Sequence, residues 1–265
     1  MQKEEKNSLS RRQCLTGIAT VGAGLSAFSL LSGCSGVNLG GSTGGSLDRV
    51  LLQNGAAMEA LATMFYFQVL KSSFYTSLSA SPRAQAFLVA AYEEELNHYK
   101  QYVTSGVSAV PSGTNMYFPA GTFTNNQITL NTLVTLEDIF IAFYLVAVRD
   151  FGSSSAKVFA GELLGVESEH RVLGRYIASD LGLTATTGFN GSAESVVPPS
   201  HAANNLAYAR IFPATLDNVN LVAQVVTPYF TAGSAGFSPT AYPFDASVQI
   251  LPSGITAVSL DNTSP

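Results

Sequence analysis

Apolar residues recur at helical spacing in four segments of the chain, which span roughly residues 47–78, 81–104, 131–151 and 154–181. Apolar positions three and four residues apart form a stripe along one side of a helix, and that stripe must be buried against a partner. Short breaks separate the members of the first pair and of the second pair. The pattern predicts an all-α fold, a four-helix bundle over residues 47–182.

The ends of these segments carry turn and capping residues. Ser81 and Pro82 suit a helix start, with the serine as cap and the proline in the first turn, and Gly182 suits a helix end. Residues 105–131 hold no charged side chain and are rich in Gly, Pro, Ser, Thr and Asn. We expect this long connection to cross the length of the bundle, so that the second and third helices run parallel.

The last third of the chain, residues 183–265, is dominated by Gly, Ser, Thr, Pro and Asn. We interpret it as an irregular extension packed on the bundle, with a short helix near 216–229. A β-hairpin of residues 247–251 and 255–260 is also expected there. His201 has no acidic neighbour in its Pro-Pro-Ser-His turn, so we assign no chemistry to it.

Charged side chains are few. The chain has 265 residues, of which 46% are hydrophobic and 12% charged, and its formal net charge is −5. No basic patch is present that could neutralise phosphates, and this excludes a nucleic-acid partner.

The first 34 residues have the organisation of a targeting segment. The sequence SRRQCL at residues 10–15 resembles a twin-arginine export signal, and the apolar run 18–31 follows it. The sequence LSGC, which ends at Cys34, resembles a bacterial lipobox, whose cysteine becomes the lipidated first residue of the mature protein. We therefore expect residues 1–34 to be the signal with its lipobox and residues 35–46 to be a flexible linker.

Lipidation of Cys34 predicts where the folded part lies. It would be held at a membrane of the cell envelope, on the periplasmic or extracellular face. The alternative is an uncleaved N-terminal anchor, which leaves the rest of the chain on the same side of the membrane.

Two Glu-x-x-His motifs lie within the second and fourth helical segments, Glu95 with His98 and Glu167 with His170. Residues three apart share one side of a helix, so each motif directs a carboxylate and an imidazole the same way. Either motif alone is common on helix surfaces. Two of them in successive apolar helix pairs favour a shared site.

One further glutamate precedes each motif on its own apolar helix, Glu59 before the first and Glu137 before the second. An ionised carboxylate in such surroundings is costly unless something compensates it. The order Glu, Glu-x-x-His, Glu, Glu-x-x-His is the ligand set of a two-metal site in the core of a four-helix bundle. Iron and manganese favour carboxylate oxygen with some imidazole nitrogen. The residues thus predict a pair of metal ions, either two iron or two manganese ions.

The second helix holds two more glutamates beside the chosen ligand. Glu94 lies four residues before His98 and is the fallback if Glu95 is not the ligand. Glu93 is expected on the solvated face of the helix.

The third and fourth helices leave similar choices. Asp138 is the alternative to Glu137, which we favour because it lies on an apolar stripe. Glu162 and Glu169 are expected to meet water or a basic neighbour such as Arg171.

Two tyrosines repeat the spacing of the glutamates. Tyr66 lies seven residues after Glu59, and Tyr144 lies seven after Glu137, which is two helical turns along the same face. A two-fold pseudo-symmetric bundle would produce this repeat. The two tyrosines either hydrogen-bond the glutamates across the core and fix their orientation or serve as core aromatics.

Together these residues resemble the ligand set of the ferritin-like superfamily, in the bacterioferritin and rubrerythrin style with one histidine on each side. With its export signal, lipobox and uncharged connection, the chain looks most similar to exported ferritin-like domain proteins related to plant desiccation-related proteins. The resemblance covers about residues 47–182. It implies two bridging glutamates, two terminal glutamates and one histidine for each metal, which are respectively Glu95 and Glu167, Glu59 and Glu137, and His98 and His170.

Two features depart from that family. An acidic residue often precedes the bridging glutamate; Glu94 fits this pattern and Val166 does not. The lipid anchor and the long extension argue against a closed storage cage, so no iron-storage capacity is carried over.

The resemblance implies a di-metal oxidoreductase that oxidises Fe(II) or reduces dioxygen or peroxide, anchored to the membrane through Cys34. One alternative is an envelope stress or desiccation-related structural protein with a vestigial or stabilising metal site. Another is a dimanganese catalase-like enzyme, which would release dioxygen from peroxide. A homodimer is an open possibility for the assembly.

Overall fold

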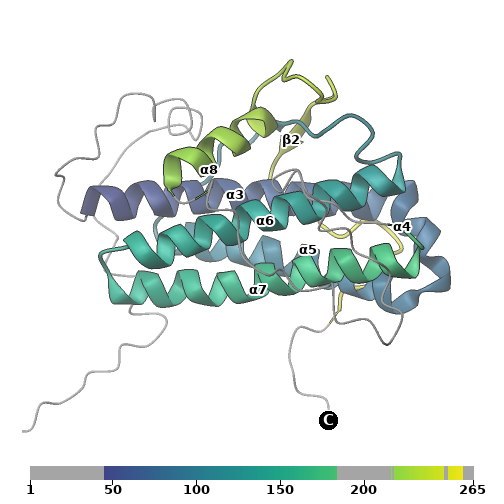
Figure 1. The fold of residues 1–265 in the computed structure, drawn as a ribbon, viewed down its shortest axis with the longest axis horizontal. Helices are drawn as coiled ribbons and strands as arrows, with labels where there is room; N and C mark the ends of the chain where they lie inside the picture. Colours follow the sequence, from purple (N-terminus) through teal and green to yellow (C-terminus); the bar gives the residue numbers. More distant parts are fainter. Residues whose placement is uncertain (1–44, 184–215, 217, 248–249, 259–265) are drawn as a thin grey trace, which may run out of the picture.

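The structure is a computed structural model that describes residues 45–183, 216, 218–247 and 250–258. Four long helices are present, and they lie side by side along the longest axis (Figure 1). α3 packs against α5, and α6 packs against α7. These helices are α3 (Gly45–Lys71), α5 (Pro82–Thr104), α6 (Asn126–Asp150) and α7 (Ser154–Asp180). The predicted all-α four-helix bundle is confirmed.

The directions of the helices follow from pairs of residues across the core. Tyr66 of α3 contacts Glu137 of α6, and Tyr144 of α6 contacts Glu59 of α3, so α3 and α6 are antiparallel. α3 and α5 are also antiparallel, because residues 72–81 turn the chain back at the end of α3 and α5 then packs along α3. It follows that α5 and α6 are parallel and that residues 105–125 return along the bundle, as the uncharged connection predicts (Figure 1).

The first helix ends earlier than the apolar pattern predicts. α3 ends at Lys71, and α4 (Ser73–Ser77) and the 3₁₀ helix η2 (Leu78–Ala80) follow it. At the break, the hydroxyl of Ser72 donates to the carbonyl of Val69 at 2.7 Å. The backbone N–H of Ser72 bonds the same carbonyl, and this i→i−3 bond tightens the last turn of α3, so the helix ends although the apolar pattern continues.

Helix caps account for the remaining boundaries. α6 begins at Asn126, before the expected residue 131, because the side chain of Asn125 caps it by accepting from Ile128 N at 3.1 Å. Ser81 precedes α5 but makes no side-chain cap, and its hydroxyl lies 3.3 Å from Asp180 Oδ2 instead. Gly182, with φ +64°, follows the end of α7 as predicted.

The extension folds back onto the bundle. α8 (Val219–Val226) packs against α6 and continues into η4 (Thr227–Phe230), close to the predicted short helix. β1 (Thr114–Met116), in the connection, pairs antiparallel with β2 (Tyr242–Phe244). The predicted hairpin falls partly on residues 248–249 and 259–260, outside the described residues. His201 and the segment 1–44, with Cys34, also lie outside them.

α6 is the most apolar of the long helices. Among the described residues it is the one helix long and apolar enough to cross a membrane, and 78% of its most apolar window is buried inside the protein. Burial against its neighbours therefore explains its composition.

Close contact between α6 and α7 depends on Gly174. A Cβ atom at this position would collide with the buried side chain of Leu133 and lie 3.0 Å from Val134 Cγ1. Gly174→Ala is expected to lower the free energy of unfolding by about 1–3 kcal/mol, the usual cost of overpacking. Gly165→Ala, with no neighbour within 4 Å, should stabilise α7 by about 0.5–1 kcal/mol. Urea unfolding of both variants checks this, and an unchanged Gly174→Ala protein would contradict it.

Candidate metal centre

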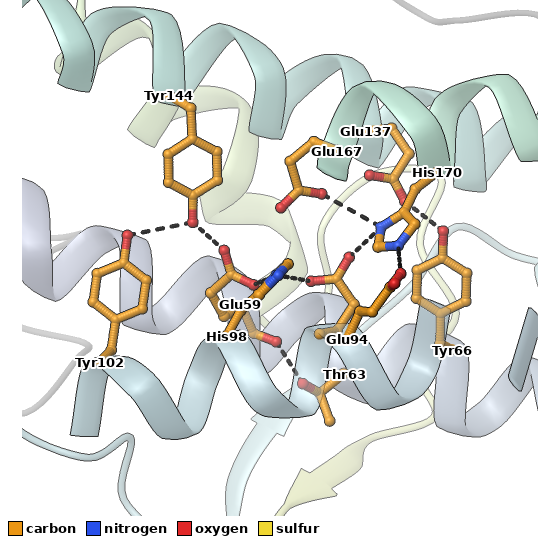
Figure 2. Close-up of polar contacts among 11 residues, drawn as sticks. Glu59, Thr63, Tyr66, Glu94, His98, Tyr102, Glu137, Tyr144, Glu167 and His170 are labelled. Carbon is orange, nitrogen blue, oxygen red and sulfur yellow. Dashed lines mark hydrogen bonds and ion pairs between the residues drawn. The ribbon is translucent and has the colours of Figure 1, made fainter. Parts of the chain in front are cut away.

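The six predicted ligands meet in the middle of the bundle. α3 contributes Glu59, α5 contributes His98, α6 contributes Glu137, and α7 contributes Glu167 and His170 (Figure 2). α5 also contributes Glu95. All six side chains are buried, with His98 the most exposed at 6%. The two lone glutamates of the apolar helices and the two Glu-x-x-His motifs thus form one buried polar cluster inside an apolar core.

The cluster divides into two overlapping groups of potential metal ligands. In each group one donor atom from every residue lies within 4.8 Å of the others. One group is Glu59, Glu95, His98 and Glu167, and the other is Glu95, Glu137, Glu167 and His170. Both groups share Glu95 and Glu167. This buried cluster could hold a metal ion, and its shared glutamates are compatible with a two-metal site.

Several ligand atoms of the cluster lack a well-oriented hydrogen bond within the described part of the chain. They are both carboxylate oxygens of Glu95 and of Glu167 and Nδ1 of both histidines, and each Nδ1 forms ion pairs with nearby glutamates instead. Nδ1 of His170 lies 2.8 Å from Glu95 Oε1, although the two groups are not in hydrogen-bond orientation. Unpaired buried acceptors are costly. A divalent cation would satisfy several of them at once, so the residues present fit an iron or manganese pair.

Burial and repulsion between the carboxylates raise pKa values in this cluster, so that its groups bind protons when no metal is present. Burial raises the pKa of Glu137 well above its ordinary value, and the neighbouring Glu167 raises it further. The pKa of Glu167 is raised by burial and by Glu95. Burial alone lowers the pKa of the two histidines, but the surrounding carboxylates outweigh it and raise both well above 6.5.

These shifts predict that the metal-free protein loses stability as pH rises. The raised pKa values mean that the folded state binds more protons than the unfolded state above about pH 4.5. The stabilisation is complete below that pH and is lost as pH rises toward the folded pKa values. We expect a lower Tm at about pH 8 than at about pH 5.5, and a smaller difference in Glu137→Gln. Calorimetry of the metal-free protein measures both; a Tm that rises over this interval would contradict the assignment.

Tyr66 and Tyr144 hydrogen-bond Glu137 and Glu59, the two glutamates that each belong to only one of the ligand groups. The hydroxyl of Tyr66 donates to Glu137 Oε1 at 2.6 Å, and the hydroxyl of Tyr144 donates to Glu59 Oε1. Burial raises the pKa of both tyrosines well above 10, so they stay protonated donors. Of the two roles expected for these tyrosines, the structure shows the hydrogen bond to a glutamate across the core. That this bond orients a metal ligand stays a prediction.

Sequence reasoning missed a third tyrosine. The hydroxyl of Tyr102 donates to that of Tyr144 at 3.3 Å, in the interior of the bundle (Figure 2). Tyr102 lies four residues after His98, on the same face of α5, and this spacing was the available signal.

Glu94, the fallback ligand, lies outside both groups. Its Oε2 atom lies 2.7 Å from Nε2 of His170, the nitrogen that points away from the cluster. The Glu94 side chain is 33% exposed. Its position suits a residue that orients the imidazole of His170. Glu93, expected to be solvated, is only partly exposed and accepts a hydrogen bond from Val258 N.

A buried ion pair beside the cluster was not foreseen. Arg171 Nε contacts Asp138 Oδ1, and both side chains are about 95% buried or more. Glu162 and Glu169 are exposed to water, as one of the two alternatives predicted, whereas the other alternative, a contact with Arg171 at the surface, is not found because Arg171 is buried. Asp138, the alternative to Glu137, belongs to this pair and not to the metal groups. Asp138 directly follows Glu137 in the sequence, and Arg171 directly follows His170. This adjacency to two predicted ligands was the available signal of the pair.

Comparison with known proteins gives one match. A family model described as a ferritin-like domain matches residues 47–179. A search of curated proteins and a search of solved structures each find no match. The matched residues include all six members of the buried cluster.

Proposed function

Because the chain belongs to the ferritin-like domain family, we propose that it binds two iron ions and oxidises Fe(II) or reduces dioxygen or peroxide. Two manganese ions are the alternative metal. The observation that carries this proposal is the pair of overlapping ligand groups that share Glu95 and Glu167. A site for a single metal would not require two glutamates to belong to both groups.

The proposal gives each cluster residue a role. Glu95 and Glu167 would bridge the two metals, Glu59 and His98 would complete one position, and Glu137 and His170 the other. When bound, an iron pair supplies one electron from each ion to dioxygen or peroxide.

The protein supports this chemistry in three ways: it excludes water, it fixes two glutamates and it lets the two shared glutamates turn. Burial of the six side chains excludes bulk water from the reacting centre. Tyr66 and Tyr144 hold one oxygen of their glutamates in place. Within the described part of the chain, the oxygens of Glu95 and Glu167 accept no well-oriented hydrogen bond, so these carboxylates can turn without breaking one.

We also propose that the protein is exported and anchored by a lipid at Cys34. The support is the sequence LSGC before the folded region and the twin-arginine-like sequence at residues 10–15. Cys34→Ala should move the protein from the membrane fraction to the soluble fraction after export. A Cys34→Ala protein that stays in the membrane fraction would contradict lipidation.

The activity is tested with the full chain in detergent, loaded anaerobically with Fe(II). On mixing with dioxygen or peroxide, the wild type should oxidise two Fe(II) per chain much faster than Glu167→Ala or buffer does. Dioxygen release from peroxide by the manganese-loaded protein would select the catalase-like alternative. Equal oxidation rates for wild type and Glu167→Ala would contradict the oxidoreductase proposal and favour a structural role.

A further inference from the structure

We propose that the two metal positions are unequal, and that the position formed by Glu137 and His170 binds its ion first and more tightly than the position formed by Glu59 and His98. This inference rests on the proposed two-metal function. We call the two the His170 position and the His98 position. The reason lies in residues around the ligands that break the pseudo-symmetry of the bundle.

The ligands themselves are symmetric. The pair α3 and α5 corresponds to the pair α6 and α7, with a glutamate on the first helix and Glu-x-x-His on the second helix of each pair. The tyrosine seven residues after each lone glutamate is repeated as well, and each donates across the core to the other glutamate. Differences between the positions therefore come from neighbouring residues.

The first difference is the carboxylate behind the imidazole. Glu94, directly before Glu95, lies 2.7 Å from Nε2 of His170. Val166 occupies the equivalent place before Glu167 on α7. The ion pairs of His98 in the described part of the chain are to Glu59 and Glu95, and both are made by Nδ1. His170 alone thus has a carboxylate on its outer nitrogen.

Such a carboxylate strengthens metal binding in two ways. With the proton on Nε2 shared with Glu94, Nδ1 of His170 keeps its lone pair directed at the cluster. The negative charge also makes the imidazole a stronger donor to a cation. Arg171, the next residue, is paired with Asp138, so its positive charge is balanced locally and does not offset the charge of Glu94.

The second difference concerns the tyrosine relay. Tyr102, four residues after His98, donates to Tyr144, which in turn donates to Glu59 (Figure 2). The residue four after His170 is Gly174, and the side chain of Leu133 fills its place. In the part of the chain that the structure describes, Tyr66 therefore has no equivalent donor behind it.

The relay weakens the His98 position. A hydroxyl that accepts one hydrogen bond becomes a stronger donor of the next. Tyr144 therefore withdraws more electron density from Glu59 than Tyr66 withdraws from Glu137. A carboxylate that is more strongly hydrogen-bonded is a weaker metal ligand. Both differences act in the same direction and favour the His170 position.

The test is an anaerobic titration of the metal-free full chain with Co(II), followed by visible absorption and calorimetry. The wild type should bind two ions in two resolved steps whose affinities differ by about tenfold or more, since loss of a residue that orients a metal ligand costs about 10–100-fold. His98→Ala should keep the tight step, and His170→Ala should lose it. Circular dichroism of each metal-free variant verifies the fold.

Substitution of Glu94 isolates its contribution. Glu94→Ala should weaken the tight step about tenfold or more and bring the two affinities together. Glu169→Ala, which removes the same charge from an exposed residue next to His170, should leave both steps unchanged. Two equal steps in the wild type, or loss of the tight step in His98→Ala, would overturn this inference and leave the two-metal function standing. Failure of the wild type to bind Co(II) would instead overturn the proposed function.

Discussion

Glu95→Gln is expected to remove both metal ions, whereas Glu59→Gln is expected to weaken only one. Glu95 belongs to both ligand groups, and its two oxygens have no hydrogen-bond partner in the protein. The glutamine side chain has the same shape but no charge and one oxygen fewer, so it cannot bridge two cations. We expect the affinity for both ions to fall by more than about a hundredfold, beyond the range seen when a residue that merely orients a ligand is lost.

The measurement is the metal content of the purified full-length variants, with Glu169→Gln as the charge-matched control. Stability separates loss of ligand from loss of fold. The metal-free Glu95→Gln protein should still unfold in one cooperative step, because glutamine keeps the volume of the side chain and lowers the charge of a repulsive cluster, although it also replaces a carboxylate that lies 2.8 Å from His170 Nδ1. A Glu95→Gln protein with two metals per chain would refute the bridging role.

Arg171→Met should produce the largest loss of stability among single substitutions near the centre. The change removes the guanidinium that contacts the buried carboxylate of Asp138, which is 2% exposed. Breaking a buried ion pair by removing one partner costs about 3–5 kcal/mol. We expect a loss of this size in the free energy of unfolding of the metal-free protein, measured with denaturant.

The double variant Asp138→Leu with Arg171→Met is the matched control. It removes both charges and replaces them with apolar groups, so it should regain most of the lost stability. Equal stability of Arg171→Met and the wild type would show that the pair does not stabilise the fold. A double variant less stable than either single variant would show that the charges have separate roles.

Local patterns predicted the features that depend on neighbouring residues. The side chains of Glu95 and His98 converge because a separation of three residues fixes their direction on any helix. The end of α7 just before Gly182 was also predictable locally, because glycine readily takes the positive φ of +64° found there. A side chain that caps or breaks a helix is harder to foresee. Ser72 ended α3 within an apolar pattern, and Asn125 started α6 earlier than the charge-free connection suggested.

Features that join distant parts of the chain were not predictable. β1 pairs with β2 across more than a hundred residues, from Thr114 to Phe244, and neither strand has the length to signal a partner. The ion pair of Asp138 and Arg171 also depends on how α6 and α7 are turned toward each other. A buried charge far from its partner in sequence is indistinguishable, before folding, from one at the surface.

The most direct test of the two-metal centre is elemental analysis of the full chain, purified in detergent after growth with both iron and manganese. The account predicts close to two metal ions per chain, and the element found decides between the iron and manganese alternatives. Absence of bound metal, even after anaerobic loading with Fe(II), would contradict it and leave the buried Glu and His cluster as part of a structural bundle.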